Sequence, residues 1–512
     1  MEDPTLAAMR AEGTIVLDDY LKAPKARSGS VGEILSLFSE LYNTPDPTIQ
    51  IFILFFVVFL GIPFVGGCVL LIMKFFKVDT VRPPRAHSWI PIVGTFIQYS
   101  TDPIGFLKRQ FLKKGRVFLI DIVLTETVCA YGEESIVEAS DKQSPFSHSL
   151  YYADQLGPLM TKGYRLKIQQ FMDIAQEHFK KFDALSSMSN ELKQFLTIKL
   201  EPYLNNPSMD LFAVSSSLYL NTMVRFCFGP KVAEDCTDLV DEFHQAELNA
   251  KFSFLKLLGN YGLPLGPNSQ FSGLLRMIGD IIEKEVKRRI KEGKEDDYLQ
   301  AILDSNIDKD DRIFVASHIA HFILLSHAGV VATVGWTGYH LLKDDKLYKK
   351  VEKEIKANNY KSLTNCIVET SRRYGAMNLY GVFKEKTNMG GFEFKRNESL
   401  FISPASVNLN PEYYDEPLEY DPDRWSKKNP ENSKKKGQLV TLNGTLYETN
   451  CEKFVNQLAT HIFIPLLFDL GTKLTASQEE KPVLPNYFST ESSPWSKCAV
   501  SFVANPQTKK NQ

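Results

Sequence analysis

The sequence lacks paired cysteines. Its seven cysteines lie at positions 68, 129, 227, 236, 366, 451 and 498 and form no CxxC pair. A zinc site or a disulfide framework needs closely or regularly spaced cysteines, so the pattern argues against both. It favours a reducing compartment for most of the chain.

The chain also lacks an excess of charge of either sign and any internal repeat. Its formal net charge is −2, which argues against a nucleic-acid-binding protein because such proteins carry a basic balance or stripe. With 512 residues, 44% of them hydrophobic, it can bury a large core in one domain or in two or three smaller ones. The 35 Phe and 21 Tyr supply such a core and would also suit a pocket for an apolar ligand.

The clearest physical feature is an uncharged apolar run over residues 51–73. Its 23 residues can cross a bilayer core of about 30 Å as a helix. Lys and Arg follow at positions 74, 77, 82 and 85, whereas residues 31–50 carry only acidic charges. The positive-inside rule then places residues 1–50 in the lumen as a tail and the main domain in the cytosol. A buried core helix is the alternative.

Prolines follow this predicted anchor. Pro83, Pro84 and Pro91 cannot continue a membrane helix, so residues 74–95 are expected to form a stiff extended linker. The main domain is then expected to span residues 96–505.

Two local patterns open the main domain. A helix is expected from Asp102 to about Lys114, ended by Gly115, because Asp and Gly favour the two ends of a helix. Residues 117–131 are rich in β-branched and aromatic side chains and predict a hairpin broken near Glu126.

Helical patterns predominate from residue 133 to residue 342. The heavily charged stretch 283–294 is expected to be a solvated helix face and loop. Residues 314–342 predict one long, nearly uncharged helix, and such a helix is usually buried through the core of a large domain. Residues 454–470 predict a further apolar helix.

Three motifs follow in a fixed order. Glu369 and Arg372 are three positions apart, so on a helix they face the same side and can pair. Arg424 follows in the segment 422–425, Pro-Asp-Arg-Trp, and Cys451 comes just before the last apolar helix. This order resembles the cytochrome P450 family over nearly the whole chain. The resemblance implies a mainly α fold with small β-sheets, with an N-terminal transmembrane helix.

The resemblance also implies a role for each motif. Glu369, Arg372 and Arg424 would form a buried triad that locks the loop carrying the haem ligand; an exposed helix pair is the alternative. A buried carboxylate is tolerated with charge-assisted hydrogen bonds, which planar guanidinium groups supply. Cys451 would bind the iron of haem b (iron protoporphyrin IX) as a thiolate, which favours O–O cleavage. A buried cysteine that binds nothing is the alternative.

The loop around Cys451 differs from the family pattern. The family has Phe, Gly and a basic residue seven, four and two positions before the cysteine, and Gly two positions after it. This chain has Gly444, Tyr447, Thr449 and Lys453 there. Side chains therefore replace glycines where the backbone would approach the porphyrin, and one expected partner of a haem propionate is lost.

The long central helix carries the candidate catalytic-site residues Ala328, Gly329 and Thr333. Most monooxygenases of the family have an acid and an alcohol at the positions of Val331 and Ala332, and neither of these side chains can donate a proton. The small pair Ala328 and Gly329 leaves room for a flat ligand. The neighbouring His327 is expected to be structural, with a catalytic role as the alternative.

The sequence over 326–336 resembles the branch of cholesterol 7α-hydroxylase, sterol 12α-hydroxylase and prostacyclin synthase. Residues 102–118 resemble the same branch and its neighbour, sterol 14α-demethylase. The likeness implies a sterol or other lipid-like ligand.

The family also suggests where substrate would lie. The segment after the Glu369 motif lines the pocket in the family, so the candidate pocket residues are Ala376, Met377, Asn378 and Leu379; ordinary strand packing is the alternative. Residues 493–498 would form a C-terminal pocket turn.

Three functions remain open from the sequence. The first is a single-pass enzyme of the endoplasmic reticulum membrane that hydroxylates a sterol or lipid with electrons from NADPH-cytochrome P450 reductase or another donor, since nothing here resembles a flavin or nicotinamide domain. The second is a lipid peroxide isomerase of the prostacyclin synthase type, which needs neither proton relay nor reductase. The third is a catalytically inactive lipid-binding protein with the same fold.

Overall fold

The structure, a computed structural model, describes residues 82–87, 94–122, 125–140, 145–147, 150, 164–180, 189–204, 206–236, 238–244, 268–306, 312–375, 379–426, 452–479, 481–486, 493–494 and 496–502. Contacts divide the chain into two units, Met1–Asp79 and Thr80–Gln512, and all described residues lie in the second. The predicted membrane anchor at 51–73 lies outside the described residues.

Helices dominate the described residues. Their bounds are α5 (Phe96–Thr101), α6 (Pro103–Lys114), α7 (Glu133–Ser140), α9 (Tyr164–Lys180), α10 (Ser189–Leu204), α11 (Leu211–Phe228), α12 (Pro230–Asp235), α15 (Asn268–Glu292), α16 (Tyr298–Asp304), α17 (Arg312–Lys343), α18 (Asp345–Lys356), α19 (Lys361–Tyr374), α20 (Ala405–Asn408), the 3-10 helix η4 (Pro422–Trp425), α23 (Glu452–Leu458), the π-helix η5 (Ala459–Phe463), α24 (Ile464–Asp469) and α25 (Ala476–Glu479).

The strands form small sheets. The largest sheet has the order β1-β2-β8-β5-β3, in which β2 and β8 are parallel and the other pairs antiparallel. A second sheet has the order β4-β12-β9, and β6–β7 and β10–β11 are two-stranded. The strand bounds are β1 (Val117–Ile122), β2 (Thr125–Ala130), β3 (Phe146–Ser147), β4 (Met209–Asp210), β5 (Leu379–Phe383), β6 (Thr387–Met389), β7 (Phe392–Phe394), β8 (Ser399–Ile402), β9 (Thr472–Leu474), β10 (Pro485–Asn486), β11 (Ser493–Pro494) and β12 (Ala499–Phe502). The prediction of a mainly helical fold with small sheets is confirmed.

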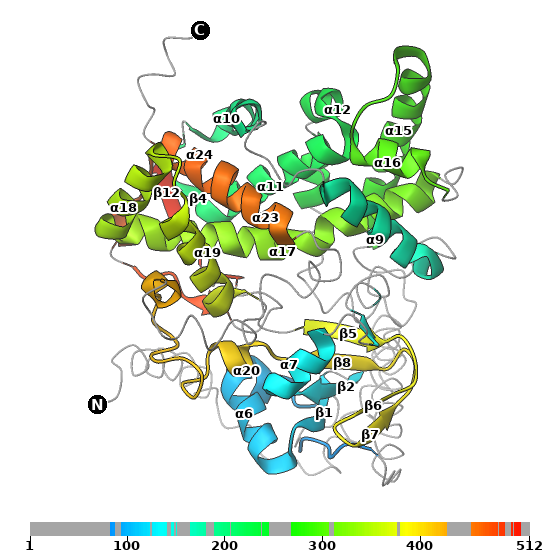
Figure 1. The fold of residues 1–512 in the computed structure, drawn as a ribbon, viewed down its shortest axis with the longest axis vertical. Coiled ribbons are helices and arrows are strands. Elements are labelled where there is room, and N and C mark those ends of the chain that lie inside the picture. Colours follow the sequence, from blue (N-terminus) through cyan, green and yellow to red (C-terminus); the bar gives the residue numbers. More distant parts are fainter. Residues whose placement is uncertain are drawn as a thin grey trace, which may run out of the picture. The chain divides into compact units, whose positions relative to one another are not determined.

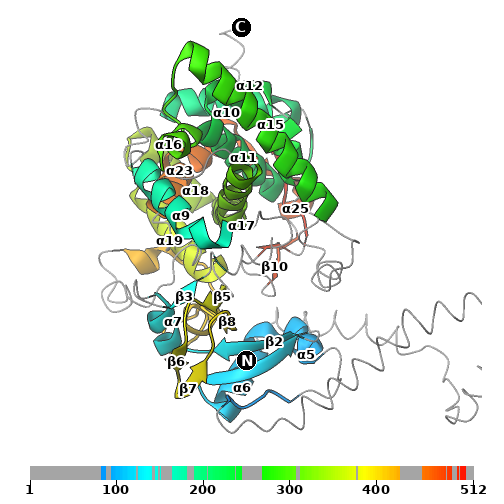
Figure 2. The same cartoon turned by 90° about the vertical axis from the view of Figure 1, so that its right-hand side faces the viewer.

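The predicted long helix is α17, and it packs against α11, α15, α19 and α24 (Figure 1; Figure 2 views it nearly end-on). By length and hydropathy α11 and α17 resemble membrane spans, but 89% and 82% of their most apolar windows are buried inside the protein. Gly335 marks the closest approach of α17 to α11, since a Cβ there would lie 2.5 Å from the ring of Phe212.

Substituting Gly335 with Val is expected to lower the free energy of unfolding by about 1–3 kcal/mol, because the added methyl groups would push the Phe212 ring out of its packed position. The matched control is Gly273→Ala in α15, where an added Cβ meets nothing within 4 Å and should stabilise the helix by about 0.5–1 kcal/mol. Denaturant titrations of both variants measure the difference. Equal effects of the two substitutions would contradict the close approach.

His318 on α17 is fully buried, its ring stacks on Phe171 at 4.1 Å and its Nε2 lies 2.6 Å from the hydroxyl of Tyr298. Burial, and secondly the neighbouring His321, lower the pKa of His318 well below its ordinary value of 6.5. The folded chain therefore keeps this imidazole neutral at pH values where the unfolded chain protonates it.

Stability is accordingly expected to fall as the pH drops below 6.5, by at most about 1.4 kcal/mol per pH unit from this group, until the lower folded pKa is reached. His318→Phe keeps a ring beside Phe171 and has no titrating group, so its free energy of unfolding should fall less steeply. Denaturant titrations at pH 7.5, 6.0 and 5.0 test this. A slope equal to that of the unsubstituted chain would show that His318 is already charged in the folded state.

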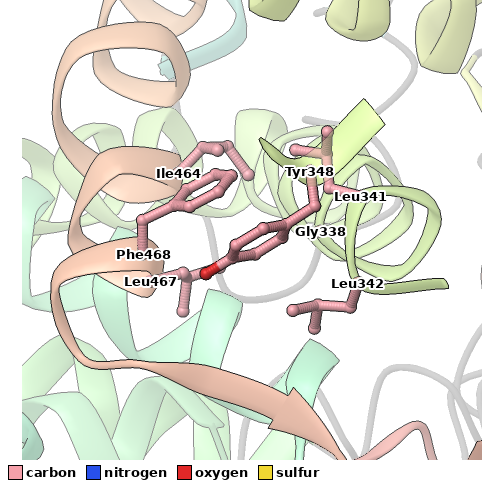
Figure 3. A pocket seen from close by; sticks show the side chains of 7 residues that line it. All are labelled: Gly338, Leu341, Leu342, Tyr348, Ile464, Leu467 and Phe468. Atoms are coloured by element: carbon pink, nitrogen blue, oxygen red, sulfur yellow. The ribbon is translucent and has the colours of Figure 1, made fainter. Parts of the chain in front are cut away.

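The predicted helix over 454–470 is interrupted. It consists of α23, the π-helix η5 and α24 in succession. Pro465 lacks the N–H that would bond the carbonyl of His461 in a regular helix, and the π turn lies at this gap. Beyond it, Phe468 packs on Tyr348 with ring centroids 4.3 Å apart, in a small apolar pocket beside Gly338 (Figure 3).

The prediction that residues 283–294 are solvated is wrong for Glu285 and Arg289, which are each 6% exposed. Arg289 donates to both carboxylate oxygens of Asp297, at 2.8 and 2.5 Å, and also to Glu285. These charged groups are tolerated in the interior because each is paired with an opposite charge. The pairing depends on tertiary contacts, which a run of charged residues in the sequence does not predict.

The proline-rich linker is fixed to the largest sheet. Arg82 bonds to Glu398 at 2.9 Å and pairs with Glu126, while Arg85 bonds to Asp121 at 2.9 Å and also pairs with Glu126. The linker backbone also pairs with β1. The described part of the linker is therefore extended and held at both arginines.

Candidate functional site

Glu369 and Arg372 lie on α19 and are both 0% exposed, and Arg424 lies on η4 and is 4% exposed. Arg372 donates from Nε to Oε2 of Glu369 at 2.9 Å and from Nη2 to Oε1 at 2.7 Å. Nε of Arg424 lies 3.4 Å from the same Oε1. We call these three residues the clasp. Glu369 and Arg372 come together because their i, i+3 spacing puts them on the same side of α19.

Two further donors complete the clasp. The backbone N–H of Asp421 donates to Oε1 of Glu369 at 3.1 Å, and the indole N–H of Trp425 donates to Oε2 at 2.8 Å. A carboxylate offers about four lone-pair sites, and these contacts fill them. Sequence reasoning assigned no role to Trp425. The tendency of a tryptophan indole N–H to find an acceptor when it is buried was the available hint, and Trp425 is partly buried.

The clasp also holds the segment that leads from α20 to η4. Arg372 donates from Nη1 to the carbonyls of Asn408 and Pro417, at 2.6 and 2.8 Å, and Arg424 donates to the carbonyl of Asp415 at 2.8 Å. Charge-assisted bonds of this kind are about twice as strong as neutral ones. Helix α19 therefore fixes the path of the backbone just before the stretch that carries Cys451.

Aromatic side chains join α17 to the clasp. Trp336 stacks on Tyr374 at 4.2 Å, and His340 stacks on Tyr420 at 3.8 Å with only 2° between the ring planes. His340 Nε2 lies 2.8 Å from the hydroxyl of Tyr374. The central helix and the clasp are thus packed as one structure.

Leu324, Ala328 and Val331 are partly exposed, whereas the other described side chains from Phe314 to Tyr339 are buried. Their i, i+4, i+7 spacing places them on one face of α17. We call this face the open strip. All three side chains are apolar, so the strip suits a flat apolar group.

Gly329 and Thr333 lie beside the open strip and are buried. The hydroxyl of Thr333 donates to the carbonyl of Gly329 at 2.8 Å, one turn earlier in the same helix. Its proton is therefore used inside α17. Val331 and Ala332 have no proton to give.

The described cysteines are unsuited to act as thiolates. Burial is the first cause that raises the pKa of each thiol, to about 12 at Cys366 and Cys498 and upward also at Cys129, Cys227 and Cys236. A metal ligand must be the deprotonated sulfur, so these five are poor candidates for binding iron.

Cys451 lies outside the described residues, but Glu452, the next residue, begins α23. The positive end of a helix favours an ionised sulfur beside it. The helical run from α23 to α24 contacts α17, and Phe454 packs on Phe179 and Phe226. A cysteine directly before the start of α23 and an apolar strip on α17 both fit a haem held by a cysteine thiolate.

Of the four predicted pocket residues, Ala376, Met377 and Asn378 lie outside the described residues. Leu379 begins β5, pairs with Ile402 and is 7% exposed. In the predicted C-terminal turn, Ser493 and Pro494 form β11.

Comparison with known proteins identifies the family. A family model described as Cytochrome P450 matches residues 83–441. The chain is 25% identical over 384 residues to lanosterol 14-alpha demethylase of Homo sapiens, covering 69% of this chain and 74% of that protein. The corresponding enzyme of Mus musculus is 24% identical, with 69% and 75% covered. Sterol 14-demethylase of Arabidopsis thaliana is 23% identical over 395 residues, with 70% and 79% covered.

The matched region contains the clasp and the open strip and ends before Cys451. It confirms the family predicted from the sequence. The relatives support a sterol-related member in general terms.

Proposed function

We propose that this chain, which belongs to the cytochrome P450 family, is a membrane-anchored haem-thiolate monooxygenase that hydroxylates a sterol or related lipid. The family and the relatives support the broad activity, that of a monooxygenase with a haem cofactor, a redox partner and a small-molecule substrate. The observation that carries the finer proposal is the apolar open strip of Leu324, Ala328 and Val331 on the buried helix α17.

In this proposal Cys451 supplies the thiolate. The clasp holds the backbone that precedes its loop, and α23 begins directly after it. When bound, the haem supplies the activation of dioxygen for insertion of one oxygen atom into a C–H bond. The chain contributes the clasp that precedes the ligand loop, an apolar wall and exclusion of water by the packed helices around α17.

The substrate follows from the chemistry of the open strip. Three aliphatic side chains along one face of α17 favour contact with a flat, apolar molecule such as a sterol ring system. Sterol demethylases among the relatives support the same class. Within this proposal, the resemblance of residues 326–336 favours the cholesterol 7α-hydroxylase, sterol 12α-hydroxylase and prostacyclin synthase branch, whereas the relatives found are sterol 14-demethylases. Ala376, Met377, Asn378 and Leu379 are the proposed pocket residues on the β5 side.

The proposal includes a location and a partner. Residues 51–73 would anchor the chain in the endoplasmic reticulum membrane as a single span, with the main domain in the cytosol. Electrons would come from NADPH-cytochrome P450 reductase or another separate donor.

One observation favours a second function. Val331 and Ala332 cannot donate protons, and the hydroxyl of Thr333 is bonded to Gly329. Rearrangement of a lipid peroxide starts with an existing O–O bond and needs no proton delivery. A peroxide isomerase is therefore the alternative enzyme.

The experiment starts from the purified full-length chain. Stoichiometric haem and a thiolate-type Soret shift in the reduced carbon monoxide spectrum are expected. Reductase, NADPH and either cholesterol or lanosterol should then give oxygen uptake and a hydroxylated sterol. Turnover of linoleic acid hydroperoxide without reductase or oxygen uptake would instead establish the isomerase. A folded chain that binds sterol without haem would overturn both and leave a lipid-binding protein.

A further inference from the structure

Two histidines from different segments meet at one serine hydroxyl. Nε2 of His327, on α17, lies 2.7 Å from Oγ of Ser216, on α11. Nδ1 of His244, the last described residue of the segment 238–244, lies 3.2 Å from the same oxygen. Ser216 and His327 are 5% and 2% exposed, whereas His244 is partly exposed. The three side chains therefore lead from the surface into the core.

The contacts allow two arrangements of the protons. A hydroxyl carries one proton, so Ser216 can donate to only one of the two ring nitrogens, and the other nitrogen must donate to Ser216. If His244 donates from Nδ1, Ser216 donates to Nε2 of His327, and His327 carries its proton on Nδ1. The groups then form a continuous hydrogen-bonded chain in which each member can pass one proton onward.

The inner end of this chain lies beside the open strip. His327 precedes Ala328, and successive residues of an α-helix are about 100° apart around its axis. His327 therefore flanks the face formed by Leu324, Ala328 and Val331, on the side toward α11.

The proposed reaction needs a proton supply at this place. Hydroxylation consumes dioxygen, two electrons and two protons, and it yields one hydroxyl group and one water. The residues at the positions of the usual acid and alcohol, Val331 and Ala332, cannot provide the protons.

We propose that His244, Ser216 and His327 form a proton relay to the open strip, an inference that rests on the proposed monooxygenase function. The Nδ1 proton of His244 moves to Oγ of Ser216, and the proton of Ser216 moves to Nε2 of His327. The Nδ1 proton of His327 then becomes available to a group bound along the neighbouring strip, and His244 takes up a proton from solvent. One proton is transferred and no electron moves. Each ring ends in its other tautomer, and the relay resets when the two rings and the Ser216 hydroxyl rotate so that each again has its proton on the original side.

A buried, hydrogen-bonded histidine can equally serve only to tie two helices together, so the test must separate proton transfer from packing. Ser216→Ala breaks the relay while changing little volume. Ser215→Ala is the matched control, because the hydroxyl of Ser215 is also buried and, among the residues that the structure describes, donates to the carbonyl of Leu211 one turn earlier, at 2.8 Å. Ser216→Thr restores a hydroxyl.

Turnover of lanosterol by the full chain is measured with reductase and NADPH, in H₂O and in D₂O, and separately with iodosylbenzene, which supplies an oxygen atom without proton delivery. Ser216→Ala should lower NADPH-driven product about 100-fold, increase the solvent isotope effect and leave iodosylbenzene-driven product within about twofold. Ser215→Ala should change neither, and Ser216→Thr should recover NADPH-driven product.

Equal losses in both assays, or wild-type NADPH-driven turnover in Ser216→Ala, would overturn the relay. An unsubstituted chain that gives no product in either assay would instead count against the proposed function. The relay then has a readout of its own, the ¹⁵N NMR signals of labelled histidines. The signals of His244 and His327 should both shift in Ser216→Ala and not in Ser215→Ala, and the absence of these shifts would also overturn it.

Discussion

Replacing Cys451 with Ala is expected to abolish the thiolate-type Soret band of the reduced carbon monoxide complex and all NADPH-driven turnover, while the chain stays folded and membrane-bound. The physical reason is that alanine has no sulfur to bind iron, and the thiolate is what favours O–O cleavage. The fold should persist because the clasp and the packing of α17 do not depend on this side chain. Absorption spectra measure the Soret band, and assays with reductase and NADPH measure the turnover. Circular dichroism checks that the chain is folded, and membrane fractionation checks that it is membrane-bound.

Cys498→Ala is the matched control. Cys498 is buried, and burial raises the pKa of its thiol to about 12, so it stays protonated and cannot serve as a thiolate. The control should keep the Soret band. Full haem absorbance and turnover in Cys451→Ala would show that the ligand is another residue.

Replacing Glu369 with Gln should lower the free energy of unfolding by about 3–5 kcal/mol, because the substitution removes the only charge that compensates two guanidinium groups within the clasp. Domains of this kind are stable by about 5–15 kcal/mol, so the loss would be a large part of the total. We also expect a lower haem content, since Arg372 and Arg424 would hold the segment before Cys451 less firmly. Denaturant titration and haem quantification measure the two effects.

The control is Glu352→Gln on α18. Glu352 accepts a hydrogen bond from Lys356 at 2.7 Å in a pair that is largely exposed, and such pairs contribute about 0–1 kcal/mol. If the two substitutions lowered stability equally, the clasp would be no more than an ordinary surface ion pair.

Features set by local sequence were predicted well. The long helix α17 lies within two residues of its predicted bounds at each end, because an apolar, unbroken stretch of this length has few alternatives to a buried helix. The Asp102 and Gly115 ends of α6 follow from capping chemistry. Glu369 and Arg372 pair because helical spacing alone brings them together.

Features set by tertiary contact were not predicted. The roles of Asp421 and Trp425 at Glu369 depend on how η4 folds back onto α19, and the burial of Glu285 depends on arginines one turn away. The meeting of Ser216 with His327, 111 positions later, has no local pattern at all. The spacing of residues in the sequence predicts contacts within one helix but not contacts between two helices.

The hydrogen bonds of the clasp to its loop go to main-chain carbonyls, among them those of Asn408, Pro417 and Asp415, while the buried ring of Tyr414 lies against the Arg372 guanidinium as a side-chain contact. Any residue offers the same carbonyl, and many side chains between 411 and 419 point into solvent. Related proteins can therefore exchange most amino acids there while keeping the number of residues constant. Insertions or deletions in this loop should therefore be rare among homologues even where its exposed residues differ.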